Sequence, residues 1–317
     1  RDYMNRYPFC LFRIPENGGR VLWEITNTCN YHCSYCIFSS EAQKYDNELN
    51  TEEVMQTIKD LRKNNFTYIK FTGGEPFTRK DMTEILKYAN KLGFDMDIST
   101  NASLITDKIA KELKRIDFPM VHVSLDGNDK YTHEFVRGEN TFERTLRGIK
   151  YLTNNQIYTR IGTVIYKKNE DKLEEIIKLS IELKANEIIF SFMEAVGRLD
   201  GDETLVSRRT IDSVKKELEN LALKYKEQIQ IKYSFSENKV TETKECCPAV
   251  NKFLYINNLG QVSPCTWVVS QNTEYKSKLT LKNSTFNEII KSEPIQKYLK
   301  YIEENKIKGC PASRRKQ

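Results

Sequence analysis

The chain has 317 residues, of which 39% are hydrophobic, and 50 basic and 44 acidic side chains give it a net charge of +6. This balance is typical of a globular protein and excludes a chain that is mostly disordered. Because the basic residues are spread along the sequence, the charge pattern does not favour nucleic-acid binding. The longest apolar runs are too short to cross a bilayer and the first residues lack a signal-peptide core, so we expect no membrane association and a cytoplasmic protein.

Short apolar runs alternate with amphipathic stretches from about residue 21 to residue 198, which is the pattern of β/α units around a parallel sheet. We therefore expect an α/β fold over 21–198, preceded by an extension (1–20) and followed by a smaller domain (199–317). The six predicted strands are Val21–Thr26, Tyr68–Thr72, Asp95–Thr100, Met120–Leu125, Thr159–Ile165 and Glu187–Phe192.

Amphipathic stretches between these strands predict the helices. Thr51 begins one whose apolar stripe includes Val54 and Leu61, and Gly93 stands where the next helix would end. Thr106 is expected to cap a third helix. Further helices are predicted around 142–149, 173–177, 211–223 and 286–301, and Asn257–Gly260 is expected to be a hairpin turn between strands at 253–256 and 261–264.

Three of the eight cysteines stand together just after the first predicted strand, as a C-x₃-C-x₂-C run of Cys29, Cys33 and Cys36. Three thiolates on one loop can each bind one iron of a [4Fe–4S] cube and leave the fourth iron open for another ligand. The alternative is a zinc site with His32 as fourth ligand. Since His32 lies inside the run between two constrained ligands, we interpret it as a loop residue. Cys10 stands apart and is interpreted as a small apolar residue.

A second motif, Gly73-Gly74-Glu75-Pro76, follows the second predicted strand. Glycines let the backbone approach a ligand closely, and a carboxylate can accept hydrogen bonds from a cationic amino group. Together with the cysteine run, this motif resembles the radical S-adenosylmethionine (SAM) superfamily. The resemblance implies a partial (β/α)₆ TIM barrel over 21–198 and a SAM molecule that chelates the open iron, with Glu75 and the adjacent backbone at its amino group.

The resemblance also implies further contacts with SAM. Tyr35 would shelter the adenine, and Ser99, Asn101 and Ser124 would lie near the ribose and sulfonium. All of these residues lie at or just past the carboxyl ends of predicted strands, where β/α barrels form their active sites. The alternative for Ser99, Asn101 and Ser124 is that they only close strand ends. Arg137 is expected either to pair with a carboxylate or to lie at the surface.

A second cysteine group consists of Cys246 and Cys247, then Cys265 at the end of a Gly-x₄-Cys segment, and finally Cys310. It resembles the shorter "twitch" form of the SPASM extension, which implies one auxiliary [4Fe–4S] cluster held by Cys247, Cys265 and Cys310. Neighbouring side chains diverge in an extended chain, so Cys246 is either a fourth ligand or a free thiol. A free thiol could donate a hydrogen atom to a substrate radical, which would make Cys246 catalytic.

The resemblance implies reductive cleavage of SAM to a 5′-deoxyadenosyl radical that abstracts hydrogen from a substrate, with electrons from a donor such as flavodoxin or ferredoxin. The preferred substrate is a residue of a peptide or protein that is oxidised, cross-linked or epimerised. One alternative is dehydrogenation or epimerisation of a small sugar or aminocyclitol. A molybdenum-cofactor-type cyclase is disfavoured because the second cysteine group lacks a C-x₂-C start. The non-enzymatic alternative is a structural module with zinc at both cysteine groups.

Overall fold

The computed structural model describes residues 18–43, 46–234, 249–266 and 273–305. Four of the eight cysteines, Cys10, Cys246, Cys247 and Cys310, lie outside these ranges. The predictions made for them are therefore not tested by the structure. Within the described residues, no helix is both long enough and apolar enough to span a membrane.

The described strands form one curved sheet in the order β7-β6-β5-β4-β3-β2-β1-β8-β9. All neighbouring pairs from β7 to β8 are parallel, and β9 runs antiparallel to β8. The predicted α/β fold with a parallel sheet is confirmed. The strands are β1 (Gly19–Thr26), β2 (Phe66–Gly73), β3 (Asp95–Thr100), β4 (Val121–Ser124), β5 (Thr159–Ile165), β6 (Glu187–Phe192), β7 (Gln230–Tyr233), β8 (Phe253–Ile256) and β9 (Val262–Ser263).

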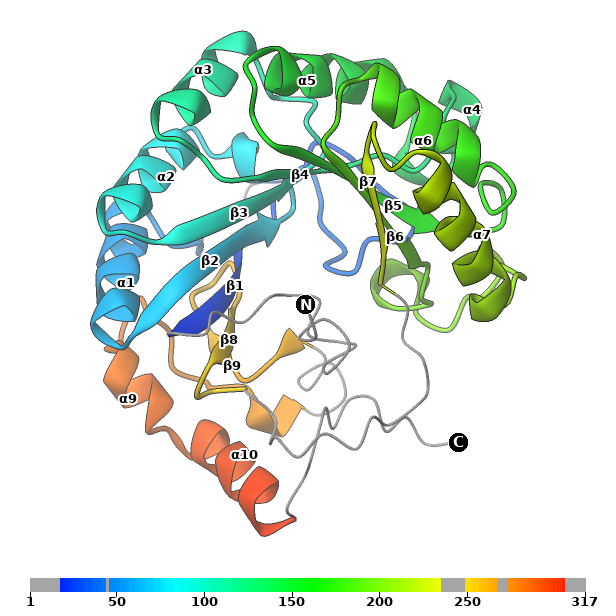
Figure 1. The fold of residues 1–317 in the computed structure, drawn as a ribbon. Coiled ribbons are helices and arrows are strands. Elements are labelled where there is room, and N and C mark those ends of the chain that lie inside the picture. Colours follow the sequence, from blue (N-terminus) through cyan, green and yellow to red (C-terminus); the bar gives the residue numbers. More distant parts are fainter. Residues whose placement is uncertain (1–17, 44–45, 235–248, 267–272, 306–317) are drawn as a thin grey trace.

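Helices cover the convex side of the sheet, as Figure 1 shows for α1 to α7. The predicted caps are confirmed where they can be tested: Thr106 accepts a hydrogen bond from the Ile109 amide, and Gly93 follows α2 with a φ of +73°. The α-helices are α1 (Thr51–Lys63), α2 (Met82–Lys91), α3 (Asp107–Arg115), α4 (Lys130–Arg137), α5 (Phe142–Asn154), α6 (Leu173–Glu182), α7 (Ile211–Lys224), α9 (Phe286–Ile290) and α10 (Glu293–Glu304), and short 3₁₀ turns lie at η2 (Pro76–Thr78), η3 (Gly197–Leu199) and η4 (Thr273–Tyr275).

Alternate residues of each strand face opposite sides of the sheet. On β1, Val21, Trp23 and Ile25 belong to the large core between the sheet and the helices, so Arg20 and Leu22 face the concave side. The same alternation places charged side chains of β2, β3, β5 and β6 on the concave side. The sheet therefore has an apolar convex face and a concave face with many polar groups.

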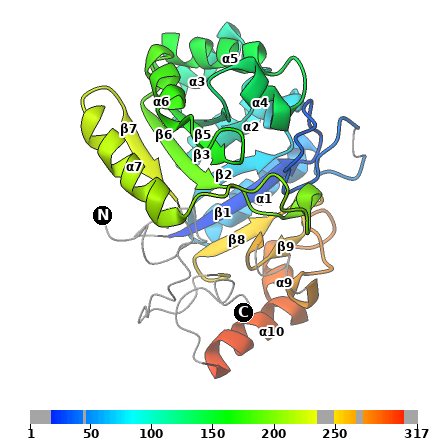
Figure 2. The same cartoon turned by 90° about the vertical axis from the view of Figure 1, so that its right-hand side faces the viewer.

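The C-terminal part of the chain continues the sheet. β8 lies beside β1 in parallel register, with Leu22 opposite Tyr255, and the predicted hairpin joins β8 to β9. A second apolar cluster forms on the concave side of β1 and β8, and Figure 2 shows α10 below these strands. Its buried members are Leu22, Ala249, Val250, Phe253, Tyr255, Cys265, Ile295, Tyr298 and Ile302.

Candidate active site

The cysteine run begins three residues after β1, and backbone hydrogen bonds hold its conformation. The Cys29 amide donates to the Glu41 carbonyl at 2.8 Å, and the Cys36 amide donates to the Cys33 carbonyl at 3.3 Å. Cys29 is buried, Cys33 and Cys36 are half-buried, and all three are free thiols. The loop therefore carries three thiols at the carboxyl end of β1.

These thiols affect one another electrostatically. Burial, together with the negative charge of Glu75 and the other two cysteines, raises the pKa of Cys29 to about 12. Such a group ionises only when a positive charge compensates it, as an iron ion does. Within the described residues, no three His, Cys, Asp or Glu side chains converge on one point that could hold a single metal ion. A cube has no such requirement because each thiolate binds a different iron.

The turn after β6 makes hydrogen bonds to the cysteine loop through Arg198. The Arg198 guanidinium donates to the Cys33 carbonyl at 2.5 Å and to the Ser40 carbonyl at 2.7 Å. The Arg198 amide donates to the Cys36 carbonyl at 3.0 Å. Gly197 has a φ of +63°, and a Cβ there would lie 2.4 Å from the Cys36 oxygen. This contact explains why a glycine precedes Arg198, and neither residue was recognised as part of the site from the sequence.

A buried ion pair lies beside Cys33. The Arg137 Nε donates to an Asp126 carboxylate oxygen at 2.7 Å, and its Nη1 lies 3.9 Å from the Cys33 sulfur. Tyr35 donates its hydroxyl hydrogen to the same Asp126 oxygen at 2.5 Å and accepts from Arg137. Of the two expectations for Arg137, the structure favours pairing with a carboxylate, since the residue is only 8% exposed. Tyr35 is thus held at the cysteine loop by its hydroxyl group.

The Gly73–Pro76 segment packs directly against the end of β1. The Gly74 amide donates to the Thr26 carbonyl at 2.7 Å, and the Glu75 amide donates to the Thr28 carbonyl at 2.9 Å. A Cβ on Gly73 or Gly74 would lie 2.2 Å from one of these two oxygens. The glycines are thus required for contact between two loops of the protein, a role that was not predicted from the sequence.

Glu75 is fully buried and accepts three hydrogen bonds. Its donors are the Asn101 amide at 2.7 Å, the Thr100 hydroxyl at 2.7 Å and the Phe77 amide at 3.1 Å. Burial raises the pKa of Glu75 to about 7, although these hydrogen bonds oppose the shift. A carboxylate has about four lone-pair sites, so one remains for a further donor such as an amino group.

The other predicted SAM contacts lie at the ends of the neighbouring strands. Asn101 donates to the Asn30 side chain at 3.0 Å, which connects the end of β3 to the cysteine loop. Ser99 and Ser124 are half-buried and fall on the concave side of β3 and β4 by strand alternation. The structure therefore brings the predicted residues of the first motif, the second motif and these two strands to one edge of the sheet.

Cys265 lies apart from this edge. It is buried, follows β9 and packs in the second apolar cluster with Leu22 and Tyr255. Because Cys246, Cys247 and Cys310 lie outside the described residues, the structure does not test whether they meet Cys265. The auxiliary cluster remains a prediction.

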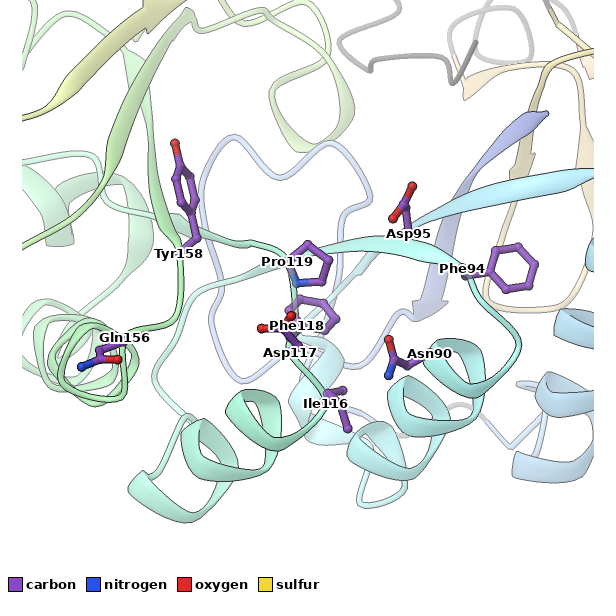
Figure 3. A pocket seen from close by; sticks show the side chains of 9 residues that line it. All are labelled: Asn90, Phe94, Asp95, Ile116, Asp117, Phe118, Pro119, Gln156 and Tyr158. Carbon is purple, nitrogen blue, oxygen red and sulfur yellow. The ribbon is translucent and has the colours of Figure 1, made fainter. Parts of the chain in front are cut away.

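A surface pocket of about 480 Å³ lies at the opposite, amino-terminal ends of β3 to β5, away from the cysteine loop. Figure 3 shows that its Tyr158 and Asp95 side chains project to the same side, away from the helices below them. The Tyr158 hydroxyl donates to Glu187 on the concave side at 3.2 Å. Because its lining lies at the strand ends opposite to the cysteine loop, this pocket is not part of the candidate active site.

A family model described as "Radical SAM superfamily" matches residues 23–180, which include the cysteine run and the Gly73–Pro76 segment. The chain is 33% identical over 190 residues to an AdoMet-dependent heme synthase of Methanosarcina barkeri, a match covering 59% of this chain and 54% of that protein. It is 26% identical over 249 residues to a PqqA peptide cyclase of Bradyrhizobium diazoefficiens, covering 77% and 66%. The chain thus spans about half the length of the first relative and about two thirds of the second.

The fold is similar to that of a solved structure at low sequence identity. The crystal structure of Streptococcus suis SuiB bound to the precursor peptide SuiA superposes with a TM-score of 0.73 and 16% identity, covering 90% of this chain and 67% of SuiB. At this identity the likeness concerns the fold alone.

Proposed function

This chain belongs to the radical SAM superfamily, and from that premise we propose that it is an enzyme that cleaves SAM reductively and uses the resulting radical to modify a peptide. The proposal depends on one observation above all. Three buried or half-buried thiols, the Glu75 carboxylate and Asn101 lie together at the carboxyl ends of β1, β2 and β3. In β/α barrels this edge is where substrates and cofactors bind.

The residues of the loop fit an iron–sulfur cube. Cys29, Cys33 and Cys36 supply three soft thiolate ligands. Burial raises the pKa values of Cys29 and Cys33, and the positive charge of bound iron would favour their ionised forms. When bound, such a cube with SAM supplies the electron transfer that yields methionine and a 5′-deoxyadenosyl radical. The protein's task is to hold and shield these groups.

We assign the holding of SAM to residues of both motifs and of the neighbouring strand ends. Glu75, through its remaining lone pair, and the backbone of Gly73, Gly74 and Pro76 would receive the amino group. Tyr35, anchored by Asp126 and Arg137, would lie against the adenine. The remaining contacts with the ribose and sulfonium are assigned to Ser99, Asn101 and Ser124.

One sequence relative and one protein of similar fold motivate the proposal of a peptide substrate. The PqqA peptide cyclase is named for action on a peptide, and SuiB has been solved with its precursor peptide. A second candidate is action on an iron porphyrin, because an AdoMet-dependent heme synthase is 33% identical to this chain over 190 residues. We also propose one auxiliary [4Fe–4S] cluster at Cys247, Cys265 and Cys310, and flavodoxin or ferredoxin as electron donor in the cytoplasm.

The first experiment is anaerobic purification followed by Mössbauer spectroscopy and iron analysis. About eight irons per chain, in two cubes of four, is the expected result. Cys29→Ala should remove one cube, whereas Cys10→Ala, the matched control, should keep both. A colourless protein with stoichiometric zinc would overturn the proposal in favour of a structural module.

The second experiment measures 5′-deoxyadenosine under dithionite, first without substrate and then with candidate substrates. Peptides, an iron coproporphyrin and aminocyclitols are compared, and we expect a peptide to accelerate product formation. Acceleration by the porphyrin alone would favour the second candidate. The proposed hydrogen-atom donor is tested by Cys246→Ala, which should abolish deuterium incorporation from D₂O if an epimerisation occurs.

A further inference from the structure

A group of polar side chains lies on the concave face of β4 to β7. It is nearer to the amino-terminal ends of these strands than the candidate active site is. Arg160 Nε lies 2.5 Å from one oxygen of Glu187, and Lys232 Nζ lies 2.8 Å from the other. Glu187 is only 1% exposed at its side chain, whereas Arg160 is 21% and Lys232 is 37% exposed. Two cations thus share one sealed carboxylate and remain accessible themselves.

The other ionic group of this face also has two cations and one carboxylate, but its side chains are buried. Arg20 and Lys70 both contact Asp97 at 3.2 and 2.8 Å, and their side chains are 2% and 8% exposed. The remaining carboxylates of this face lie elsewhere: Glu24 is on β1, where it accepts from Tyr255 at 2.5 Å, and Asp95 is at the start of β3. In the described part of the chain, Glu187 is the carboxylate that lies within ion-pair distance of Arg160 and Lys232.

His122 completes this group from β4, where it pairs in register with Arg160. A Cβ on Gly162 would lie 2.0 Å from the His122 Nε2, so the glycine makes room for the imidazole ring. The Nδ1 is buried and has no hydrogen-bond partner within the described residues. A buried polar atom without a partner costs free energy, which a bound ligand would recover.

We propose that Arg160, Lys232 and His122 form a binding site for a carboxylate of the substrate, namely an acidic side chain of a peptide. Arginine binds carboxylates with two parallel hydrogen bonds, and Glu187 holds the two cations in place for this contact. The assignment to the substrate rests on the proposed function, whereas carboxylate binding by itself does not.

The position of this site relates it to the candidate active site. His122 is opposite Ser99 in the sheet register and two residues before Ser124. Two residues of a strand span about 7 Å. A glutamate or aspartate bound at Arg160 would therefore place its own backbone, or that of an adjacent residue, within a side chain's length of the predicted sulfonium position.

The test uses the anaerobically prepared full chain without reductant, so that binding is measured apart from SAM cleavage. Ligand-observed saturation-transfer NMR compares acetyl-Gly-Glu-Gly-amide with acetyl-Gly-Gln-Gly-amide, which has the same shape without the charge. We expect saturable binding of the Glu peptide, and binding of the Gln peptide that is weaker by roughly tenfold or more. Equal binding of the two peptides, or binding of neither, would overturn the proposal.

Variants locate the binding. Lys232→Gln and Arg160→Gln should each weaken the Glu peptide by roughly tenfold, Arg160→Lys should recover part of the affinity, and Lys226→Gln, an exposed control with a 68% exposed side chain, should have no effect. Thermal melts identify any variant that fails to fold. Because Lys232 is the most accessible member, a folded Lys232→Gln that binds like the wild type would exclude this site.

A third ligand, acetyl-Gly-Gln-Gly with a free carboxyl end, separates a side-chain carboxylate from a chain terminus. Binding of this ligand as tight as that of the Glu peptide would contradict the assignment to an acidic side chain. If the Glu peptide binds as expected while SAM is never cleaved, only the proposed function fails. If SAM is cleaved but the Glu peptide is not preferred, only the carboxylate site fails.

Discussion

Arg137 is a buried cation in contact with both a carboxylate and a candidate iron ligand. Its Nη1 lies 3.9 Å from the Cys33 sulfur. A reduced cluster carries one more negative charge than an oxidised one, so a nearby cation stabilises the reduced form. We predict that Arg137→Gln lowers the midpoint potential of the first cluster by roughly 60 mV, which corresponds to a tenfold change in a one-electron equilibrium. An EPR-monitored potentiometric titration measures this.

Two comparisons make that prediction specific. Arg147→Gln changes an exposed arginine on α5 and should leave the potential unchanged. Arg137→Lys keeps the positive charge, so its midpoint potential should be close to that of the wild type. Arg137→Gln also leaves the buried Asp126 carboxylate without its cation, which should lower the free energy of unfolding by about 3–5 kcal/mol. An unchanged potential in a folded Arg137→Gln protein would contradict the electrostatic role.

Glu75 gives a prediction about pH. Burial raises its pKa to about 7 from an ordinary value of 4.5. Between these values the folded protein keeps a proton that the unfolded chain loses, so this contribution to stability is complete below pH 4.5 and is lost as the pH rises through 7. The full effect is about 3 kcal/mol. Urea unfolding from pH 4.5 to 7.5 should show a smaller loss of stability for Glu75→Gln than for the wild type, and parallel curves would contradict the assignment.

The sequence identified single residues of the site better than their partners. The spacing of Cys29, Cys33 and Cys36 is local, and therefore readable from the chain. The contact of Arg137 with Asp126, or of Arg198 with the cysteine loop, depends on how the folded chain brings separate loops together. A single sequence contains no information on which of its many charges will meet, so these contacts could be found only from the structure.

At the scale of elements, the loop that begins at Gly73 packs so closely against the end of β1 that a larger residue does not fit at this position. Gly73 and Gly201 both have positive φ angles, of +136° and +76°, but only at Gly73 would an added Cβ lie 2.2 Å from a backbone oxygen. Gly201→Ala should cost about 1 kcal/mol of unfolding free energy for its φ alone. Gly73→Ala should cost a further 1–3 kcal/mol, approximately, and reduce the iron bound per chain, because the end of β1 must move. Urea midpoints and iron analysis test both variants, and equal effects would contradict this account.

Strands and helices with strong patterns were predicted well, and weak ones were not. The six predicted strands agree with β1 to β6 because their apolar runs are long enough to be distinctive. β7 was not predicted, since Gln230–Tyr233 has only four residues and two of them are polar. The predicted helix over 286–301 is two helices, because α9 ends at Ile290 and α10 begins at Glu293 with a proline in its first turn.

At the scale of the whole molecule, strands from both sides of the predicted boundary belong to one sheet. The predicted boundary near residue 198 separates a core from an appendage. In the structure, α7 and β7 add another parallel unit after that point, and β8 pairs with β1 along the other side of the sheet. Sequence patterns do not specify which strand edge a late segment will occupy, so this pairing could not be predicted.

The arrangement leads to a prediction about truncation. A chain of residues 1–234 retains β1 to β7 but loses β8, which leaves the edge of β1 and the side chain of Leu22 uncovered. An exposed edge strand invites aggregation. We therefore expect the truncated chain to aggregate or to melt at least about 10 °C below the full chain, a shift that corresponds to a few kcal/mol.

The full chain should by contrast unfold in one cooperative transition, because strands from both predicted domains share one sheet. Differential scanning calorimetry and size-exclusion chromatography measure both properties on anaerobically prepared protein. Adding residues 249–317 as a separate polypeptide should restore part of the lost stability, since β8 binds β1 through backbone hydrogen bonds and side-chain packing. If residues 1–234 remain monomeric with an unchanged melting temperature, the C-terminal part is an independent appendage and the shared sheet does not contribute to stability.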